Sequence, residues 1–185
     1  MELTDISLTV TQTHDRLIHL LKEEPASSEI EALVSTLEQE QPADLNVDGP
    51  LLRGVWELRW SSSKQPWLRQ VPWLENLQIL DPDQGRGRNC LKLAGPLGTL
   101  ASIQVEAALE LVSDKRVEVR FQRGGWKGPQ LGRFRLQLMR EVNQSFPAWL
   151  DITVLDQELR ICRGNAGTTF ALLRRPESVN MTKDS

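Results

Sequence analysis

Residues 155–170 read LDQELRICRGNAGTTF and decide the fold class of this chain. Apolar and polar side chains alternate on both sides of two short segments, Asp156-Gln157 and Gly164-Asn165-Ala166-Gly167. Glycine and asparagine accept the positive φ angles that tight hairpin turns require. The stretch therefore predicts two consecutive β-hairpins.

The same two-residue period continues through most of the chain after Arg53. Alternating runs occur at 54–60, 100–112, 117–122, 133–138 and 150–154, with shorter candidates at 76–81, 88–93, 158–163 and 168–174. Eight or nine antiparallel strands with one polar face are typical of a closed or nearly closed barrel, which leaves no exposed strand edge. Such a barrel either is filled by its own side chains or encloses one small apolar ligand.

The first 50 residues follow a helical period instead. Ile6, Val10 and Leu17 lie near helical spacing before Pro25, and a second apolar helix face follows from Ile30 until Gln41-Pro42. We expect residues 1–50 to form a helical pair packed on or flanking the barrel. Residues 51–175 then form a lipocalin-like antiparallel β-barrel, and residues 176–185 form a flexible tail.

Composition indicates one ordinary globular domain. The chain has 185 residues, of which 39% are hydrophobic and 25% charged, enough for a single core. No apolar run approaches the roughly 20 residues of a membrane-spanning helix, and the acidic N-terminus predicts neither a signal nor a transit peptide. Cys90 and Cys162 lack the spacing of a metal or redox motif, so we expect no metal and a reducing compartment.

The charges are unevenly distributed along the chain. Residues 1–50 carry two basic and eleven acidic side chains, whereas the remainder carries twenty basic and fourteen acidic ones. Two interpretations remain open: a solvated acidic helix pair beside a barrel of mixed charge, or a basic barrel face turned toward anionic lipid. Nucleic acid is a poorer partner, because the chain is acidic overall, lacks tyrosine and has no Lys/Arg run.

Two segments resemble one known family. Residues 155–170 match a signature of Leu-Asp, two residues, Leu-Arg-Ile, one residue, Arg-Gly, and then a glycine before an apolar strand. Residues 54–61, GVWELRWS, match a start of Gly-x-Trp-x-Leu, an aromatic residue and Ser/Thr, with Trp60 where Tyr is usual. The chain thus resembles the plastid-lipid-associated proteins, or plastid fibrillins, in particular a cyanobacterial member. The signature positions are Gly54, Trp56, Asp156, Arg160, Arg163 and Gly164.

These signature positions have mainly structural interpretations. Lipocalin-type barrels also begin with Gly-x-Trp, and their indole closes one barrel end under an arginine from a late strand. Arg160 or Arg163 is the candidate for this cation–π contact with Trp56. We expect Asp156 to form an ion pair with one of these arginines that braces the hairpin, and anchoring the polar head of a ligand is the alternative. Catalysis is disfavoured, because arginine does not titrate near neutral pH and no histidine is nearby in the sequence.

Aromatic side chains are the candidates for ligand contact. Trp67 and Trp73 lie in the proline-bounded segment 66–74, which is either a loop folded over the barrel end or a lid that meets lipid. Trp126 lies in the glycine-rich segment 124–128, expected to be a second mobile loop. Trp60 is expected on the same strand face as Trp56. The predicted ligand-binding residues are Trp60, Trp67, Trp73, Trp126 and Phe134.

The sequence contains no catalytic motif that we recognise, with neither Gly-x-Ser-x-Gly nor His-Glu-x-x-His. The resemblance implies association with lipid globules and photosynthetic membranes, and binding of small isoprenoids such as carotenoids, quinones or tocopherols. We therefore predict a non-enzymatic binder of a hydrophobic isoprenoid, quinone, carotenoid or lipid, without cofactor or metal. It is expected in the cyanobacterial cytoplasm, on the thylakoid surface, or in a plastid if the chain is a mature form.

Two other hypotheses remain. The first is a scaffold with a filled barrel that associates with thylakoid lipid or with a prenylquinone biosynthetic enzyme. The second is a chromophore lyase, since some cyanobacterial lyases share lipocalin-like folds, although their sequence hallmarks are not apparent. An internal cavity of a few hundred cubic ångströms would favour the carrier over the scaffold.

Overall fold

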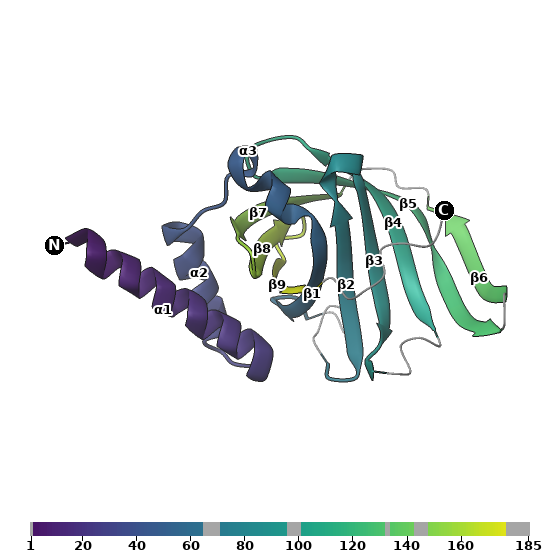
Figure 1. Cartoon of the computed structure of the whole chain (residues 1–185), viewed down its shortest axis with the longest axis horizontal. Coiled ribbons are helices and arrows are strands. Elements are labelled where there is room, and N and C mark those ends of the chain that lie inside the picture. The colour runs from purple at the N-terminus through teal and green to yellow at the C-terminus, as the bar shows by residue number, and fades with distance from the viewer. Residues whose placement is uncertain (1, 65–70, 96–100, 132–133, 143–147, 177–185) are drawn as a thin grey trace.

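A computed structural model describes residues 2–64, 71–95, 101–131, 134–142 and 148–176, which form N-terminal helices followed by β-strands (Figure 1). The helical elements are α1 (Glu2–Glu23), α2 (Ile30–Glu40), α3 (Leu45–Asp48) and the short 3-10 helices η1 (Gly49–Leu52) and η3 (Pro82–Gln84). The strands are β1 (Gly54–Ser61), β2 (Leu74–Asp81), β3 (Arg86–Leu93), β4 (Ser102–Leu111), β5 (Arg116–Leu131), β6 (Phe134–Glu141), β7 (Ala148–Leu155), β8 (Leu159–Gly164) and β9 (Thr169–Arg175). The predicted tail after residue 176 lies outside the described residues.

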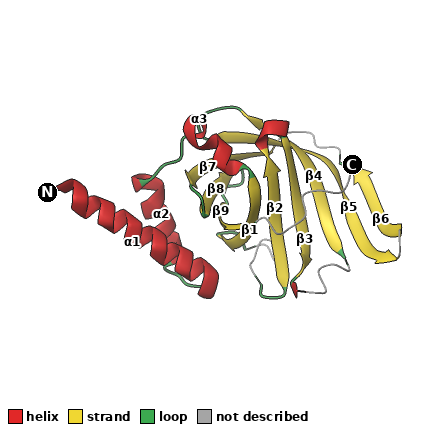
Figure 2. Cartoon of the chain, viewed as in Figure 1, coloured by secondary structure: helices red, strands yellow, loops and turns green. Residues whose placement is uncertain are grey.

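The strands pair into a ring. All pairs are antiparallel, in the order β4-β3-β2-β1-β9-β8-β7-β5-β6, and an additional β4–β5 pairing joins the two sides. Strand β5 closes the ring because Val117, Glu118 and Val119, near its start, pair with both β4 and β7. Strand β6 pairs with the later part of β5, and helices α1 and α2 lie at the opposite end of the molecule (Figure 2). The prediction of a mainly β, antiparallel fold preceded by helices is confirmed.

The predicted loop at 124–128 is wrong, because these residues belong to β5. A register shift opposite Glu106 and Ala107 absorbs one extra residue, and the strand continues past it. A Cβ atom on Gly125 would clash with the carbonyl oxygen of Leu138 on β6. This glycine therefore permits two strands to approach closely, which is a different use of glycine from a turn.

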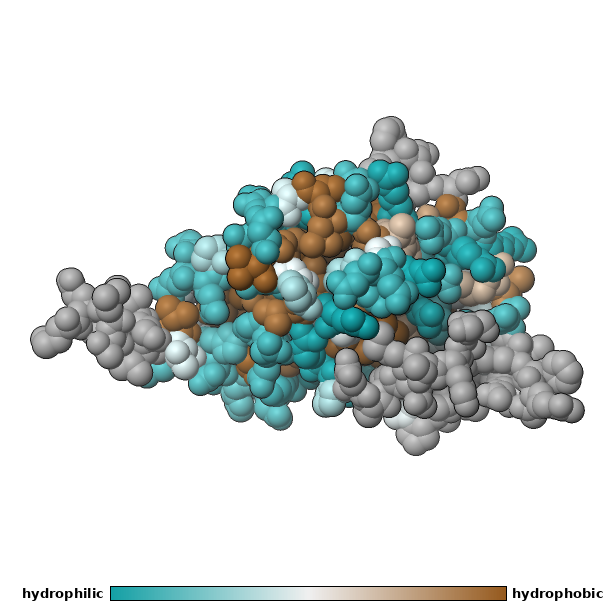
Figure 3. Space-filling model, turned by 45° about the horizontal axis from the view of Figure 1, so that its top comes forward, coloured by the Kyte–Doolittle hydropathy of each residue, from teal (hydrophilic) through white to brown (hydrophobic). Residues whose placement is uncertain are grey.

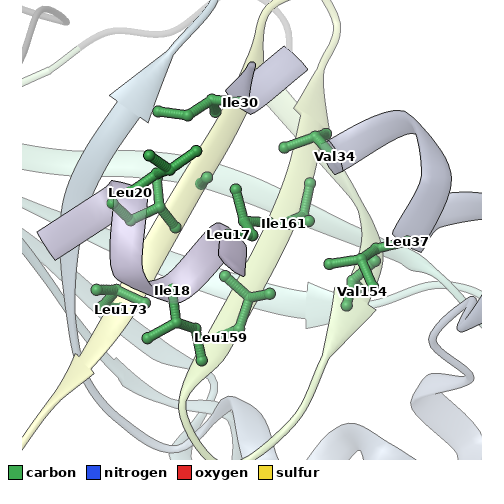
Figure 4. Close-up of a cluster of buried hydrophobic side chains, with 12 residues drawn as sticks. Leu17, Ile18, Leu20, Ile30, Val34, Leu37, Val154, Leu159, Ile161 and Leu173 are labelled. Atoms are coloured by element: carbon green, nitrogen blue, oxygen red, sulfur yellow. The ribbon is translucent and has the colours of Figure 1, made fainter. Parts of the chain in front are cut away.

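The main core lies between the helices and the outer face of β7, β8 and β9. Leu17 and Leu20 of α1 and Leu37 of α2 are fully buried against Ile161 of β8 and Val154 of β7 (Figure 4). Strand β8 is also buried on its inner face, where Cys162 joins a second cluster with Trp56 of β1. Side chains alternate between the two faces of a strand, so β8 separates two apolar cores.

A β-bulge at Arg59 changes the face of the residue that follows it. Leu58 pairs with Leu172 and Trp60 pairs with Ala171, so Arg59 is the extra residue. The expectation that Trp60 shares a face with Trp56 is therefore wrong: Trp60 packs against the helix-facing core.

The bulged residue holds the end of α1. The Arg59 guanidinium donates to the carbonyl oxygens of Leu21 at 2.8 Å and Lys22 at 2.9 Å. Carbonyls in the last turn of a helix have no partner within the helix, so Arg59 satisfies them and fixes α1 to β1.

Two further polar contacts fix the helices to the β8 hairpin. Asp156 accepts hydrogen bonds from the backbone amides of Glu158 and Leu159, both at 2.8 Å, and contacts His14 Nε2 at 2.9 Å. Arg163 donates two hydrogen bonds to Glu38 of α2, at 2.5 and 2.8 Å.

The predicted pairing of Asp156 with an arginine is wrong. Strand alternation turns Arg160 inward, and the partner of Asp156 is a histidine 142 residues away in the sequence. The distance along the chain is the reason that no local pattern could indicate this contact.

Both members of the His14–Asp156 pair have shifted pKa values. The hydrogen bond to Asp156 raises the pKa of His14 from its ordinary value of 6.5. Burial acts to raise the pKa of Asp156, but the hydrogen bonds from His14 and from two backbone amides outweigh it, and the pKa lies below its ordinary 3.8. The charged pair is therefore favoured in the folded protein.

We expect Leu17→Ala to lower the free energy of unfolding by about 2–5 kcal/mol, because Leu17 is fully buried between α1 and the barrel. Urea denaturation measures this value. The matched control is His19→Ala on the exposed side of the same helix, which should change stability by about 0.5 kcal/mol or less. Equal effects of the two substitutions would contradict the packing of α1 on the barrel.

We expect stability to fall as the pH rises above neutral, and His14 to cause part of this fall. The folded protein holds the His14 proton more tightly than the unfolded chain, so this contribution is complete below pH 6.5 and is lost as the pH rises through the raised pKa. The Asp156 contribution is present above pH 3.8 and is lost as the pH falls through its lowered pKa. Urea denaturation at a series of pH values checks both signs.

His14→Gln should remove that part of the pH dependence, whereas His19→Gln should leave it unchanged. Asp156→Asn keeps an oxygen for the backbone amides and should cost about 1 kcal/mol near pH 6 through the lost charged contact. If the His14→Gln profile has the same slope as the parent profile, the contact does not contribute to stability.

Candidate functional site

The ring of strands lines a partly open cavity of about 290 Å³. Its wall is mainly aliphatic and aromatic and comes from η1 and from the inward-facing residues of the strands. The apolar lining residues are Leu52, Leu58, Leu80, Ala107, Leu109, Leu111, Val117, Val119, Phe121, Trp149, Leu150, Ile152 and Phe170. Such a wall is typical of sites for small hydrophobic molecules.

A buried tryptophan, Trp56, lies in contact with the cavity-lining residue Arg160. The Trp56 side chain is fully buried, and its indole N–H donates to the Leu52 carbonyl oxygen at 2.9 Å. The Arg160 Cζ atom lies 5.2 Å from the centroid of the Trp56 ring, in the contact that the lipocalin-type pattern predicts. Arg163, the other candidate, is turned to the helix side and binds Glu38.

A third arginine, Arg174, was missed by the sequence analysis. Its Cζ atom lies 4.3 Å from the Trp56 ring centroid, and its side chain donates to backbone carbonyls of Gln157, at 2.6 Å, and Arg53, at 2.7 Å. The sequence could have indicated this position, because Phe170, Leu172 and Arg174 are two residues apart on β9 and therefore share one strand face. Gly54 has a φ of 136°, and a Cβ atom there would clash with the Arg174 guanidinium. Gly54 is therefore required both by its backbone and by this arginine.

Arg160 is the chemically unusual residue of the site. Its side chain is 1% exposed, and its Nη2 donates to the Gln78 side-chain oxygen. Within the described ranges no carboxylate lies at ion-pair distance from it, and its Nε is buried without a hydrogen-bond partner. Burial lowers the pKa of Arg160 to about 10, and the positive charge of Arg174 acts in the same direction. The site therefore holds one buried cation whose charge no acidic side chain compensates.

The remaining polar groups of the lining are neutral. Asn76, Gln78 and Asn89 contribute amides from β2 and β3, and Asn165 and Thr168 come from the β8–β9 turn. Among the lining residues that the structure describes, Arg160 is the single charged side chain. The cavity can therefore hold a mainly apolar molecule and hydrogen-bond one polar group.

The five predicted ligand-binding residues lie elsewhere among the described parts of the chain. Trp60 packs in the helix-facing core, and Trp73 and Trp126 are 62% and 42% exposed. Trp67 and the Phe134 side chain lie outside the described residues. None of the five is among the described lining residues, so ligand contact by them stays a prediction. The aromatic lining residues Phe121 and Phe170 were not singled out, although their positions on alternating strands could have indicated them. Alternation would not have indicated Trp149, which lies between the lining residues Ala148 and Leu150 and is opposite Glu118.

Trp126 belongs to an exposed apolar row on the cavity-facing side of the sheet. Ile103, Trp126 and Leu138 are register partners on β4, β5 and β6, and all three are exposed. Ile103 shares its strand face with Ala107, a cavity-lining residue, so the row continues the inner surface of the ring. Apolar patches also interrupt the hydrophilic surface in the view of Figure 3.

Other chemical groups offer little to a catalytic interpretation. Burial raises the pKa of the Cys90 and Cys162 thiols, which makes them poor nucleophiles. Within the described segments, no three metal-ligating side chains come together. None of the described helices has the length and the apolar character that crossing a bilayer requires.

Several known plastid proteins are similar to this chain in sequence. The chain is 29% identical to the probable plastid-lipid-associated protein 2, chloroplastic, of Arabidopsis thaliana, covering 80% of the chain and 63% of the relative. It is 29% identical to the light-induced protein, chloroplastic, of Solanum tuberosum, covering 94% and 69%. It is 26% identical to the chromoplast-specific carotenoid-associated protein, chromoplastic, of Cucumis sativus, covering 82% and 61%.

The chain spans between 61% and 69% of the length of these three relatives. No solved structure gives a significant match. The sequence profile of the family described as PAP_fibrillin matches residues 12–173, which include α2, the strand ring and the Leu155–Phe170 hairpins. The chain therefore belongs to the PAP_fibrillin family.

Proposed function

We propose that the chain binds a small hydrophobic molecule, an isoprenoid, quinone, carotenoid or lipid, without enzymatic chemistry, at or near photosynthetic membranes. The observation that carries this proposal is the cavity of about 290 Å³ with its mainly apolar wall. A barrel filled by its own side chains, as the scaffold hypothesis requires, would leave no such space. The names of the plastid-lipid-associated and carotenoid-associated relatives support the same class of ligand.

The cavity size restricts the ligand. A volume of about 290 Å³ lies at the lower end of the range that is usual for pockets of small molecules. Burial of hydrocarbon against this wall contributes about 25 cal/mol for each Å² removed from water. A short isoprenoid, a quinone ring or an acyl chain fits this space, whereas a full-length carotenoid would extend beyond it.

Exposed apolar side chains support peripheral contact with lipid. Trp73 and the row of Ile103, Trp126 and Leu138 present hydrophobic area to solvent. Tryptophan is favoured at the interface between water and hydrocarbon because its ring is apolar and its N–H is polar. Contact of these residues with a membrane would bring the protein to the source of an apolar ligand.

We expect protein purified gently from a photosynthetic host to carry a hydrophobic compound in near-stoichiometric amount. Mass spectrometry of an organic extract would detect and identify it. Ala107→Phe places a large ring in the cavity and should remove at least nine-tenths of the compound, whereas Trp73→Ser, on the exposed surface, should retain it. Circular dichroism would verify that both variants fold. An empty extract, with equally little bound apolar probe in solution, would contradict the carrier and favour the scaffold.

We expect the double variant Trp73→Ser, Trp126→Ser to bind liposomes of thylakoid lipid composition more weakly, by about thirtyfold or more, without unfolding. Each exposed indole that enters the interface contributes about 1–2 kcal/mol by the burial of its apolar area. Co-flotation measures binding, and Val47→Ser, which removes an exposed apolar side chain from α3, is the matched control. Equal co-flotation of the double variant and the parent would remove these residues from membrane contact and direct attention to a protein partner such as a biosynthetic enzyme.

A further inference from the structure

We propose that the cavity selects a hydrocarbon that carries one carboxylate, and that this carboxylate lies against the Arg160 guanidinium. The proposal rests on the proposed function, because it names the chemical class of the molecule in the same cavity. It predicts that an acid binds more tightly than the alcohol of the same chain length.

The positive charge of Arg160 has no negative counterpart in the described lining of the cavity. Arg160 is 1% exposed and lines the cavity, and the lining residues that the structure describes include no aspartate or glutamate. An isolated buried charge is costly, and proteins usually pair it with an opposite charge or with several hydrogen bonds. In this protein the described side chains supply Gln78 and the Trp56 ring, both of which are neutral. A ligand anion would supply the missing charge.

The Arg160 guanidinium also has unused hydrogen-bonding capacity. A guanidinium group has five N–H donors in a planar fork, and a carboxylate accepts two of them side by side. The Gln78 oxygen accepts from Nη2, and the buried Nε donor has no partner among the described residues. Asn76 and Asn89 line the same cavity and add amide donors that a carboxylate oxygen can accept from. The guanidinium thus has a donor that no described residue of the lining satisfies.

The guanidinium is also already held in place. The centroid of the Trp56 indole lies 5.2 Å from the Arg160 Cζ atom. The side-chain oxygen of Gln78, on β2, accepts a hydrogen bond from the same guanidinium. The second arginine on Trp56, Arg174, directs donors to backbone carbonyls of Gln157 and Arg53. A preorganised donor loses little side-chain freedom when a ligand binds, which strengthens binding.

The charge count also favours a carboxylate over a phosphate or diphosphate. One guanidinium balances one negative charge, and the described lining contains no lysine and no second arginine. A diphosphate would bring further negative charge into an apolar cavity without a partner. A carboxylate matches the single cation, and the apolar wall accommodates its hydrocarbon chain.

The test compares dodecanoic acid with dodecan-1-ol, which share a chain length and differ in the head group. Isothermal titration calorimetry at about pH 8, below the concentrations at which the acid forms micelles, measures both dissociation constants. We expect the parent protein to bind the acid at least tenfold more tightly than the alcohol, as a charge-assisted bidentate contact predicts. Arg160→Met replaces the guanidinium by a shorter, unbranched side chain that carries no charge. It should weaken binding of the acid at least tenfold and change binding of the alcohol less than about threefold.

Two further measurements separate the effect of the cavity from the effect of the carboxylate contact. Ala107→Phe fills the cavity and should weaken binding of both compounds. Carbon NMR of carboxyl-labelled dodecanoic acid bound to the unaltered protein should give a lower pKa for the bound acid than for the free acid, a result that does not depend on the folding of any variant. A raised pKa would overturn the proposal.

Failure of this proposal and failure of the proposed function look different. If the acid and the alcohol bind equally tightly and Arg160→Met changes neither, the carboxylate site is refuted while the hydrophobic cavity stands. If neither compound binds and the protein carries no hydrophobic compound, the proposed function fails and this proposal fails with it.

Discussion

Burial of β8 on both of its faces is the constraint on which the rest of the structure depends. Leu159 and Ile161 face the helices, whereas Arg160 and Cys162 face the interior of the ring. A shift of one residue in the pairing of β8 would move the guanidinium into the helix-facing core and the aliphatic side chains into the cavity wall. The register with β7 and β9 is therefore fixed by burial on two sides, and it fixes both the helices and the cavity.

The helices add polar contacts to this apolar arrangement. His14 of α1 contacts Asp156, and Glu38 of α2 contacts Arg163. Each of the two helices is therefore joined to the β7–β9 hairpins by a hydrogen bond, whose geometry is directional. The acidic character of the first 50 residues is thus partly used in pairing with the barrel, as Glu38 shows. The basic barrel also pairs internally, for instance through Arg116 and Asp151 at 2.6 Å. The apolar row on β4–β6 is consequently a stronger argument for lipid contact than the net charge of the barrel.

The fold could be predicted from the sequence because alternation and turn residues are local signals. The two hairpins at 155–170 and the helical N-terminal segment followed from such patterns. The cation–π contact with Trp56 was expected from the likeness to lipocalin-type barrels, with Arg160 and Arg163 as alternatives, and the structure places Arg160 there. The face of Trp60 could not be predicted, since one bulged residue, Arg59, reverses the alternation after it. Gly125 looked like a turn residue because a sequence does not show that another strand passes close to it. The cavity and the His14–Asp156 contact depend on residues that only the closed ring brings together.

The position of Arg160 supports the proposal that the interior of the strand ring is a binding site and not simply a core. An aliphatic side chain at the same place could fill space beside Trp56 without the cost of desolvating a charge. The protein instead holds a guanidinium there with one side-chain hydrogen bond, next to space that its own residues leave empty. The neighbours Cys162 and Gly164 are small, so β8 does not fill that space with its own bulk. A cation, neutral amides and an apolar wall around one cavity are together better explained by a bound molecule than by packing alone.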